Sequence, residues 1–233
     1  MTDPMDHLAT SLTWQEARTS GDAVGAALPV GAEGAAWLAS VAGPGREVVY
    51  SGAGSSYYLA QAAAAAHRAV TGWPAIAVPP SELLLRPTTA LGEAVPEDRP
   101  LVAISRSGST SEVVELVDRS AAEGRPTIGI TCRGDAPLAV RVDRAWVSPA
   151  GDEKAIVMTR SFTSMLALAL RATAGAAAAG GSAKASRIAA DLDGLPGLWS
   201  STVPVVERAL ELATRSWLRI AVLGGGAAFG LAN

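Results

Sequence analysis

The stretch that decides the fold is Leu101–Thr110, with the sequence LVAISRSGST, together with the run Ser111–Ala122 that follows it. Leu101–Ser105 is uncharged and largely apolar, which is typical of a short strand buried on both faces. The run Ser111–Ala122 has apolar residues at helical spacing, which predicts an amphipathic helix. A buried strand that passes through a glycine turn into such a helix is the repeating unit of a parallel α/β sheet.

The same alternation of strands and helices extends on both sides of this stretch. We expect further strands at 47–50, 74–78, 126–131 and 144–147, and helices at 57–70 and 162–179. Short apolar strands separated by helices predict an α/β fold, with a parallel five-stranded sheet flanked by helices in three α/β/α layers.

The composition excludes several classes of protein. Hydrophobic residues make up 49% of the 233 residues and charged residues 18%, which excludes a disordered chain. The formal net charge of −3 argues against a nucleic-acid partner and against a basic membrane anchor. The apolar run 162–179 is interrupted by Thr163 and Arg171, so we expect a buried helix rather than a membrane span. The single cysteine, Cys132, rules out an intrachain disulfide and favours a cytoplasmic location.

Hydroxyl side chains crowd the turn after the strand at 101–105. Gly108 is flanked by Ser105, Ser107, Ser109 and Thr110, with Arg106 among them. A helix N-cap needs only one such hydroxyl. Four hydroxyls, with the N–H groups of the turn and the positive end of the following helix, favour capture of a phosphate monoester. Arg106 would add a charged donor.

A second turn of this kind, Gly52–Ser56, follows the strand at 47–50. It is not a dinucleotide fingerprint, because Tyr57 stands where the third glycine is needed. In a parallel sheet, two turns at the carboxyl edge can converge on one ligand in the crevice.

Three motifs in this order resemble the sugar isomerase (SIS) domain family. They are the serine/threonine turn Ser105–Thr110, the glycine-serine turn Gly52–Tyr57 and the segment Asp152–Met165. The resemblance covers about 46–175, and its third motif is most like that of tagatose-6-phosphate ketose/aldose isomerases and galactosamine-6-phosphate deaminases. It implies a flavodoxin-like, SIS-type sheet.

The resemblance also implies roles for individual residues. Those implied to hold a sugar phosphate are Ser55, Ser56, Ser105, Arg106, Ser107 and Thr110, and those implied to contact the sugar are Gly54 and Thr159. It implies neither a metal nor a cofactor. It implies a homodimer with a shared active site, in which the main carboxylate base lies on the first helix of a second SIS domain.

The domain organisation that follows has four parts. We expect an N-terminal helical segment at 1–45, with helices at about 8–26 and 33–42, and a first SIS domain at 46–179. Helices between domains follow at 180–216, and 217–233 resembles the start of a second, apparently truncated SIS domain. Arg46–Ser56 and Arg219–Gly230 share a pattern of strand and glycine turn, which either a duplicated unit or the general likeness of parallel strands explains.

Glu153 is the best candidate for a catalytic base within this sequence, because it opens the third motif. The alternative is an acid at a helix start that stabilises the helix dipole. His67 and Cys132 are expected to be packed groups, and Lys154 is expected to lie at the surface.

The expected function is proton abstraction at C1 or C2 of a hexosamine or ketose 6-phosphate. This chemistry is aldose–ketose isomerisation, possibly with deamination. One alternative is an N-acetylhexosamine-6-phosphate dehydratase or lyase that uses the same site. Another is a non-catalytic sugar-phosphate sensor, which the absence of a basic recognition helix at 1–45 makes less favoured.

Overall fold

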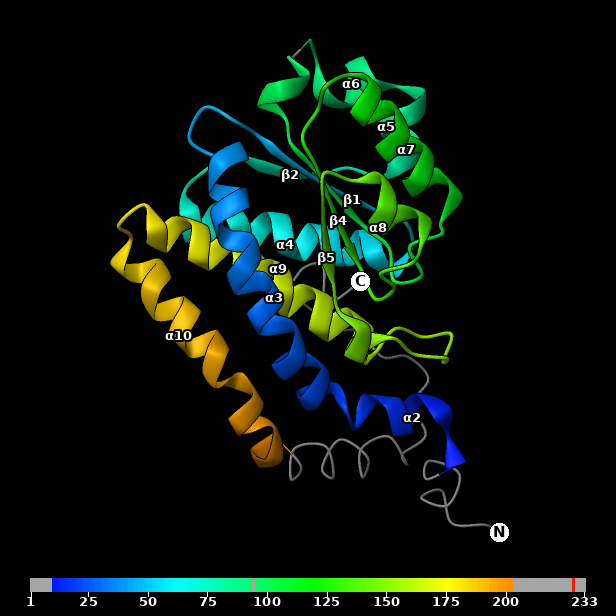
Figure 1. Ribbon diagram of the computed structural model, residues 1–233, viewed down its shortest axis with the longest axis vertical. Coiled ribbons are helices and arrows are strands. Elements are labelled where there is room, and N and C mark those ends of the chain that lie inside the picture. The colour runs from blue at the N-terminus through cyan, green and yellow to red at the C-terminus, as the bar shows by residue number, and fades with distance from the viewer. Residues whose placement is uncertain (1–9, 94, 203–227, 229–233) are drawn as a thin grey trace, which may run out of the picture.

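The computed structural model describes residues 10–93, 95–202 and 228, and its centre is a parallel five-stranded sheet (Figure 1). The strands are β1 (Val48–Gly52), β2 (Ala75–Ala77), β3 (Leu101–Ile104), β4 (Thr127–Thr131) and β5 (Arg144–Val147). Their order across the sheet is β2-β1-β3-β4-β5. The predicted five-stranded parallel α/β fold is therefore confirmed.

Helices cover both faces of this sheet. The described helices are α2 (Leu12–Ala17), α3 (Ser20–Val41), α4 (Ser55–Thr71), α5 (Pro80–Leu85), α6 (Pro87–Leu91), α7 (Ser111–Ala122), α8 (Pro137–Arg141), α9 (Arg160–Ala179) and α10 (Ala183–Leu198). Short 3-10 turns lie at Pro96–Asp98, Pro149–Gly151 and Trp199–Thr202. Helices α3, α4 and α9 pack on one face, and α5, α7 and α8 pack on the other.

Alternation along the strands explains the three layers. Val48 and Tyr50 of β1 point into the core shared with α3, α4 and α9, whereas Val49 between them points toward α5 and α7. Every residue of β1 and β3 is buried. Strands that bury both faces need apolar side chains throughout, which is why the sequence shows continuous apolar runs rather than alternation.

The N-terminal helices differ from the prediction. The sequence predicts one helix at 8–26 and another at 33–42, but α3 runs without a break from Ser20 to Val41 and contains Pro29. Proline removes one backbone donor and normally ends a helix. Packing outweighs this cost: α3 lies so close to α9 that a Cβ on Gly31 would stand 2.5 Å from the carbonyl oxygen of Leu168.

Two described helices, α3 and α9, are long and apolar enough to cross a membrane. Both are core helices here, since Leu38 of α3 and Leu168 of α9 are buried in the same cluster as the sheet. Their packing against each other and the sheet accounts for their apolar sequences. The expected burial of 162–179 is confirmed.

Helix α10 packs outside α3 and α9. Ala189 and Leu192 of α10 form a third apolar cluster with Val24, Leu28 and Ala174. Helix α10 ends at Leu198 and is therefore longer than the helical stretch predicted at about 184–193. The helix expected beyond Thr202, the strand at 217–223, its glycine turn and the proposed second SIS domain at 217–233 lie outside the described residues.

Candidate functional site

The two hydroxyl-bearing turns start side by side at the carboxyl edge of the sheet. Strands β1 and β3 are parallel neighbours, and their register pairs Gly52 with Ile104, the last residue of each strand. From β1 the chain continues through α4 to β2 on one side of the sheet, and after β3 it continues through α7 to β4 on the other. Such a reversal of strand order opens a crevice between the two connections, where α/β proteins bind ligands.

The first turn, Gly52–Ser56, brings the backbone into close contact with itself. A Cβ on Gly52 would lie 2.7 Å from the carbonyl carbon of Ser56, so only glycine fits there. Gly54 has a φ of 57° and is the N-cap of α4. The turn leaves Ser55 exposed, whereas Ser56 is buried with its Oγ 3.9 Å from Sδ of Met158. The first and third motifs are therefore in contact.

The hydroxyls of the second turn bond to one another. Oγ of Ser105 lies 2.9 Å from Oγ1 of Thr110, and the Gly108 N–H donates to the same Ser105 oxygen at 3.2 Å. Ser109 donates from both its N–H and its hydroxyl to Oγ of Ser107. Ser105 is buried, while Ser107 and Thr110 are partly exposed at the N-terminal end of α7. The hydroxyls of this turn thus shape it through their own hydrogen bonds, and those of Ser107 and Thr110 are also partly exposed.

We expect Gly108→Ala to lower the free energy of unfolding by about 2 kcal/mol. Alanine is disfavoured in a left-handed backbone, and its Cβ would crowd the neighbouring side chains. Gly108 has a φ of +64°, and a Cβ there would lie 2.5 Å from Cβ of Ala136 and 2.9 Å from Oγ1 of Thr131. The matched control is Gly72→Ala, at φ +74° with no atom within 4 Å of the new Cβ, which isolates the backbone cost of about 1 kcal/mol. Urea denaturation measures both, and equal losses would contradict the crowding at Gly108.

Arg106 does not point freely out of the second turn. Its Nη1 donates to the carbonyl oxygen of Ala155 at 2.8 Å, in the third motif. Its own carbonyl oxygen accepts from Oγ1 of Thr131 and from the N–H of Cys132, each at 3.1 Å. Arg106 therefore joins the second turn to the third motif, a contact that the sequence analysis did not predict.

Glu153, the predicted candidate base, is a buried carboxylate in the irregular segment that precedes α9. It accepts from the Thr159 N–H at 2.9 Å, from the Thr159 hydroxyl at 2.6 Å and from the Ser161 hydroxyl. These donors stand at the N-cap and in the first turn of α9. The hydrogen bonds are those of a helix-capping acid, and they also engage the hydroxyl of Thr159, the residue implied to contact the sugar.

Glu16 of α2, which no sequence motif marks, is buried against the third motif. Its two carboxylate oxygens accept from the N–H groups of Lys154, at 2.7 Å, and Ala155, at 2.9 Å. Burial acts to raise the pKa of Glu16, but these two backbone donors and the charges of Arg160 and Arg106 outweigh it, so the pKa is lowered. A lone acid 138 residues away from its partner in sequence leaves no pattern that would have identified it.

Cys132 and His67 are buried, as predicted for both. Burial raises the pKa of the Cys132 thiol to about 12, and the charges of Asp152 and Glu153 add to this, so the thiol stays protonated. His67 lies in the core beside Tyr50. Within 10–93 and 95–202, no group of three or more His, Cys, Asp or Glu side chains could hold a metal ion.

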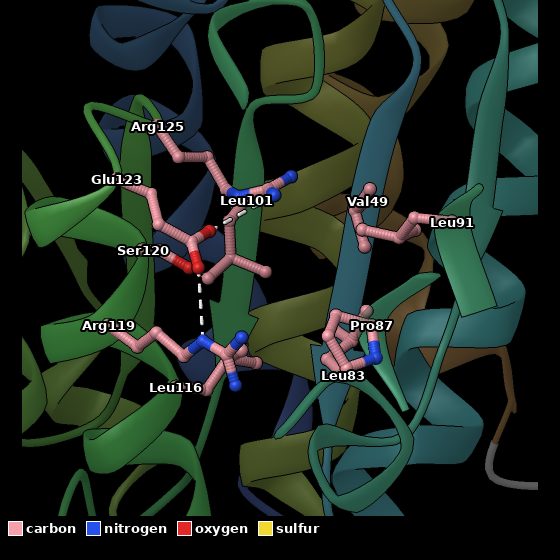
Figure 2. A pocket seen from close by; sticks show the side chains of 10 residues that line it. All are labelled: Val49, Leu83, Pro87, Leu91, Leu101, Leu116, Arg119, Ser120, Glu123 and Arg125. Carbon is pink, nitrogen blue, oxygen red and sulfur yellow. Dashed lines mark hydrogen bonds and ion pairs between the residues drawn. The ribbon is translucent and has the colours of Figure 1, made fainter. Parts of the chain in front are cut away.

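A separate hollow lies between α5, α6 and α7, on the face of the sheet opposite α3, α4 and α9 (Figure 2). Val49 and Leu101 form part of its floor, and Glu123 bridges two arginines at its rim, with Arg119 at 3.0 Å and Arg125 at 3.6 Å. Its volume of about 20 Å³ holds one water molecule. It cannot take a sugar.

A doubly wound parallel domain with two hydroxyl-bearing turns at its switch point belongs to the α/β class that binds small ligands at the carboxyl edge of the sheet. The sequence profile of the SIS domain family matches residues 45–173. The chain belongs to the SIS domain family.

Several proteins of similar sequence or structure have names that include a sugar phosphate. The chain is 28% identical over 123 residues to a glutamine–fructose-6-phosphate aminotransferase (isomerizing) of Halobacterium salinarum. This match covers 53% of this chain and 20% of that protein. The C-terminal domain of glucosamine-fructose-6-phosphate aminotransferase from Francisella tularensis superposes with a TM-score of 0.77 at 20% identity, over 96% of this chain and 64% of that one. Tagatose-6-phosphate ketose/aldose isomerase from Escherichia coli gives 0.73 at 24%, over 96% and 62%.

A further solved relative is glucosamine-6-phosphate deaminase from Thermotoga maritima, with a TM-score of 0.67 at 26% identity, over 95% of this chain and 64% of that one. The chain therefore spans less than two thirds of the length of each of these relatives.

Proposed function

We propose that this chain binds a hexosamine or ketose 6-phosphate at the β1/β3 edge and interconverts its aldose and ketose forms, with or without loss of ammonia. The observation that carries the proposal is the pairing of Gly52 with Ile104, which starts two hydroxyl-bearing turns next to each other. The names of the relatives support the same substrate class.

In this proposal the phosphate sits against the second turn. The N-terminal end of α7 supplies a favourable dipole, and the partly exposed hydroxyls of Ser107 and Thr110 supply donors, with Ser55 facing the same edge from the first turn. The open-chain sugar then extends toward the third motif, which contacts the first turn through Met158 and the second through Ala155. Binding energy from the phosphate positions C1 and C2.

Moving a proton between C1 and C2 needs a base. Glu153 is occupied by the N-terminal end of α9. We therefore assign the base to a segment outside the described residues or to a partner copy in a homodimer. The same engagement of Glu153 favours, as a second candidate, a sugar-phosphate sensor without turnover. A dehydratase or lyase acting on an N-acetylhexosamine 6-phosphate would start with the same proton removal at C2.

In the test, the full chain is titrated with fructose 6-phosphate, glucosamine 6-phosphate and N-acetylglucosamine 6-phosphate. Calorimetry measures the affinity for each ligand. Unphosphorylated fructose is the control. Assays for ketose, ammonia and an ultraviolet-absorbing enone then separate isomerase, deaminase and dehydratase. Tight binding with no product supports the sensor. Equal affinity for fructose and fructose 6-phosphate would refute the phosphate site.

Replacing both Ser105 and Ser107 by alanine is expected to weaken fructose 6-phosphate binding about tenfold or more, because hydrogen bonds to a charged phosphate are lost. Ser105 also shapes the turn, so Ser107→Ala alone serves as a milder second variant. Ser186→Ala on the exposed side of α10 is the matched control and should bind like the unmodified chain. Unchanged affinity in the double variant would place the phosphate elsewhere.

A further inference from the structure

Polar anchors hold the middle of the segment 153–158 beside the candidate site, and Met158 at its end packs against the core. Ile156 is 93% exposed and Val157 is 63% exposed, and the segment has no regular secondary structure. Ile156 and Val157 gain little from burial, so hydrogen bonds contribute strongly to the backbone order of this part of the segment. The anchors lie on three different elements: α2, the second turn and the start of α9.

The peptide units at Ala155 are held on both sides. The Ala155 N–H donates to Oε2 of Glu16 at 2.9 Å, and the Ala155 carbonyl oxygen accepts from Nη1 of Arg106 at 2.8 Å. The other oxygen of Glu16 accepts from the Lys154 N–H, so one carboxylate fixes two consecutive peptide groups. Arg106 is itself part of the second turn. Glu16 therefore holds, from α2, the same peptide group that Arg106 holds from the second turn.

A cation network keeps Glu16 in place. Nη2 of Arg160 lies 3.7 Å from Oε1 of Glu16, and Nη1 of the same arginine donates to Oγ1 of Thr19 at 3.0 Å. Nε of Arg160 donates to the carbonyl oxygen of Asp152 at 3.0 Å, at the start of the same segment. Glu16 is 6% exposed, and a buried carboxylate with two N–H donors and a cation retains its charge.

We propose that Glu16 is a positioning residue for sugar recognition: it fixes the segment 153–158 at the distance from the second turn that suits the sugar of a bound sugar phosphate. This inference rests on the proposed function. It assigns to the N-terminal helix α2, which lies outside the matched SIS region, a direct part in the geometry of the site. The hydroxyls of the phosphate subsite bond to one another and to the N–H groups of their own turn, so Glu16 reaches that subsite only indirectly, through Ala155 and Arg106.

The test compares two ligands on two variants. Glu16→Gln keeps the size of the side chain but turns an NH₂ group toward one of the two backbone N–H donors, so only one peptide stays anchored. The control is Glu33→Gln, the same change at an exposed position of α3. Calorimetric affinities are measured for fructose 6-phosphate and for inorganic phosphate.

We expect Glu16→Gln to bind fructose 6-phosphate about tenfold more weakly, while its affinity for inorganic phosphate changes less than about threefold. Glu33→Gln should bind both ligands like the unmodified chain. A merely structural role for Glu16 would not change the ratio of the two affinities. An unchanged ratio therefore overturns the proposal for Glu16 and leaves the proposed function standing.

Failure of the unmodified chain to bind fructose 6-phosphate would instead overturn the proposed function, and the positioning role with it. Should Glu16→Gln not fold, Glu16→Asp replaces it, because the shorter carboxylate keeps its charge but cannot reach both N–H groups. The same loss of preference for fructose 6-phosphate over phosphate is expected there. An unchanged preference in Glu16→Asp would count against the positioning role in the same way.

Discussion

Glu153→Ala is expected to lower the free energy of unfolding by about 4 kcal/mol, because hydrogen bonds to a buried carboxylate contribute about 1.5–3 kcal/mol each. Removing this carboxylate leaves the Thr159 N–H and the hydroxyls of Thr159 and Ser161 without their acceptor. Glu153 is only 4% exposed, so water cannot easily replace it. The N-terminal end of α9 also loses its favourable negative charge.

Urea denaturation measures this loss, and Asp152→Ala is the neighbouring control. Asp152 is partly exposed, pairs with Arg133 and accepts from the Glu153 N–H at 3.1 Å, so its removal should cost about 1–2 kcal/mol, less than the loss at Glu153. Glu153→Gln separates a structural from a catalytic role. If Glu153 is the cap, the amide variant loses stability, since an NH₂ group then faces the donors of Thr159. A fully stable Glu153→Gln protein that has lost all turnover would make Glu153 the base and the cap interpretation wrong.

The sequence predicted those parts of the fold in which the deciding forces are local. The helix predicted at 111–122 is α7, with the same bounds, because its apolar spacing lies within one short window. The hydroxyl of Thr110, which precedes it, bonds to Ser105 and does not cap the helix. The strands β1, β3 and β4 are predictable because burial on both faces demands continuous apolar runs, whereas Arg144 and Ala145 of the edge strand β5 are exposed and do not follow this rule. The meeting of the two turns follows from strand order, since parallel strands place their carboxyl ends at one edge.

Long-range polar contacts could not be predicted in this way. A carboxylate on α2 that accepts from the backbone of Lys154 uses a donor that every non-proline residue has, so no residue type marks the partner. The contact of Arg106 with the Ala155 carbonyl oxygen is hidden for the same reason. The unbroken helix through Pro29 shows the converse case, in which a strong local signal lost to packing against α9.

A buried pair of ring side chains sits in the core between β1 and α4. Nδ1 of His67 lies 2.9 Å from the hydroxyl oxygen of Tyr50. The ring centroids of Trp73 and His67 are 6.2 Å apart. Within the described residues, Nε2 of His67 has no hydrogen-bond partner. Burial raises the pKa of Tyr50 to about 12, so the phenol stays neutral, and the pair offers no counter-charge to an imidazolium.

Burial, with a smaller contribution from the charge of Arg68, lowers the pKa of His67 from 6.5 to about 4. Between these two values the unfolded chain binds a proton that the folded chain does not, so stability falls as the pH falls. The stabilising difference is complete above pH 6.5 and is lost progressively down to about pH 4, and a shift of this size corresponds to about 3 kcal/mol.

Urea denaturation from pH 7.5 to 4.5 should therefore show a steady loss of stability in the unmodified chain. His67→Gln removes the titration, and its stability, lower at pH 7 because the ring packing is lost, should change much less over the same range. The pKa of Glu16 is also lowered, from 4.5, but its stabilising effect is lost only as the pH falls below about 4.5, so it does not contribute to the change expected above that pH. Parallel curves of stability against pH for the unmodified chain and His67→Gln would contradict this prediction. They would show that His67 binds a proton as readily in the folded state as in the unfolded state.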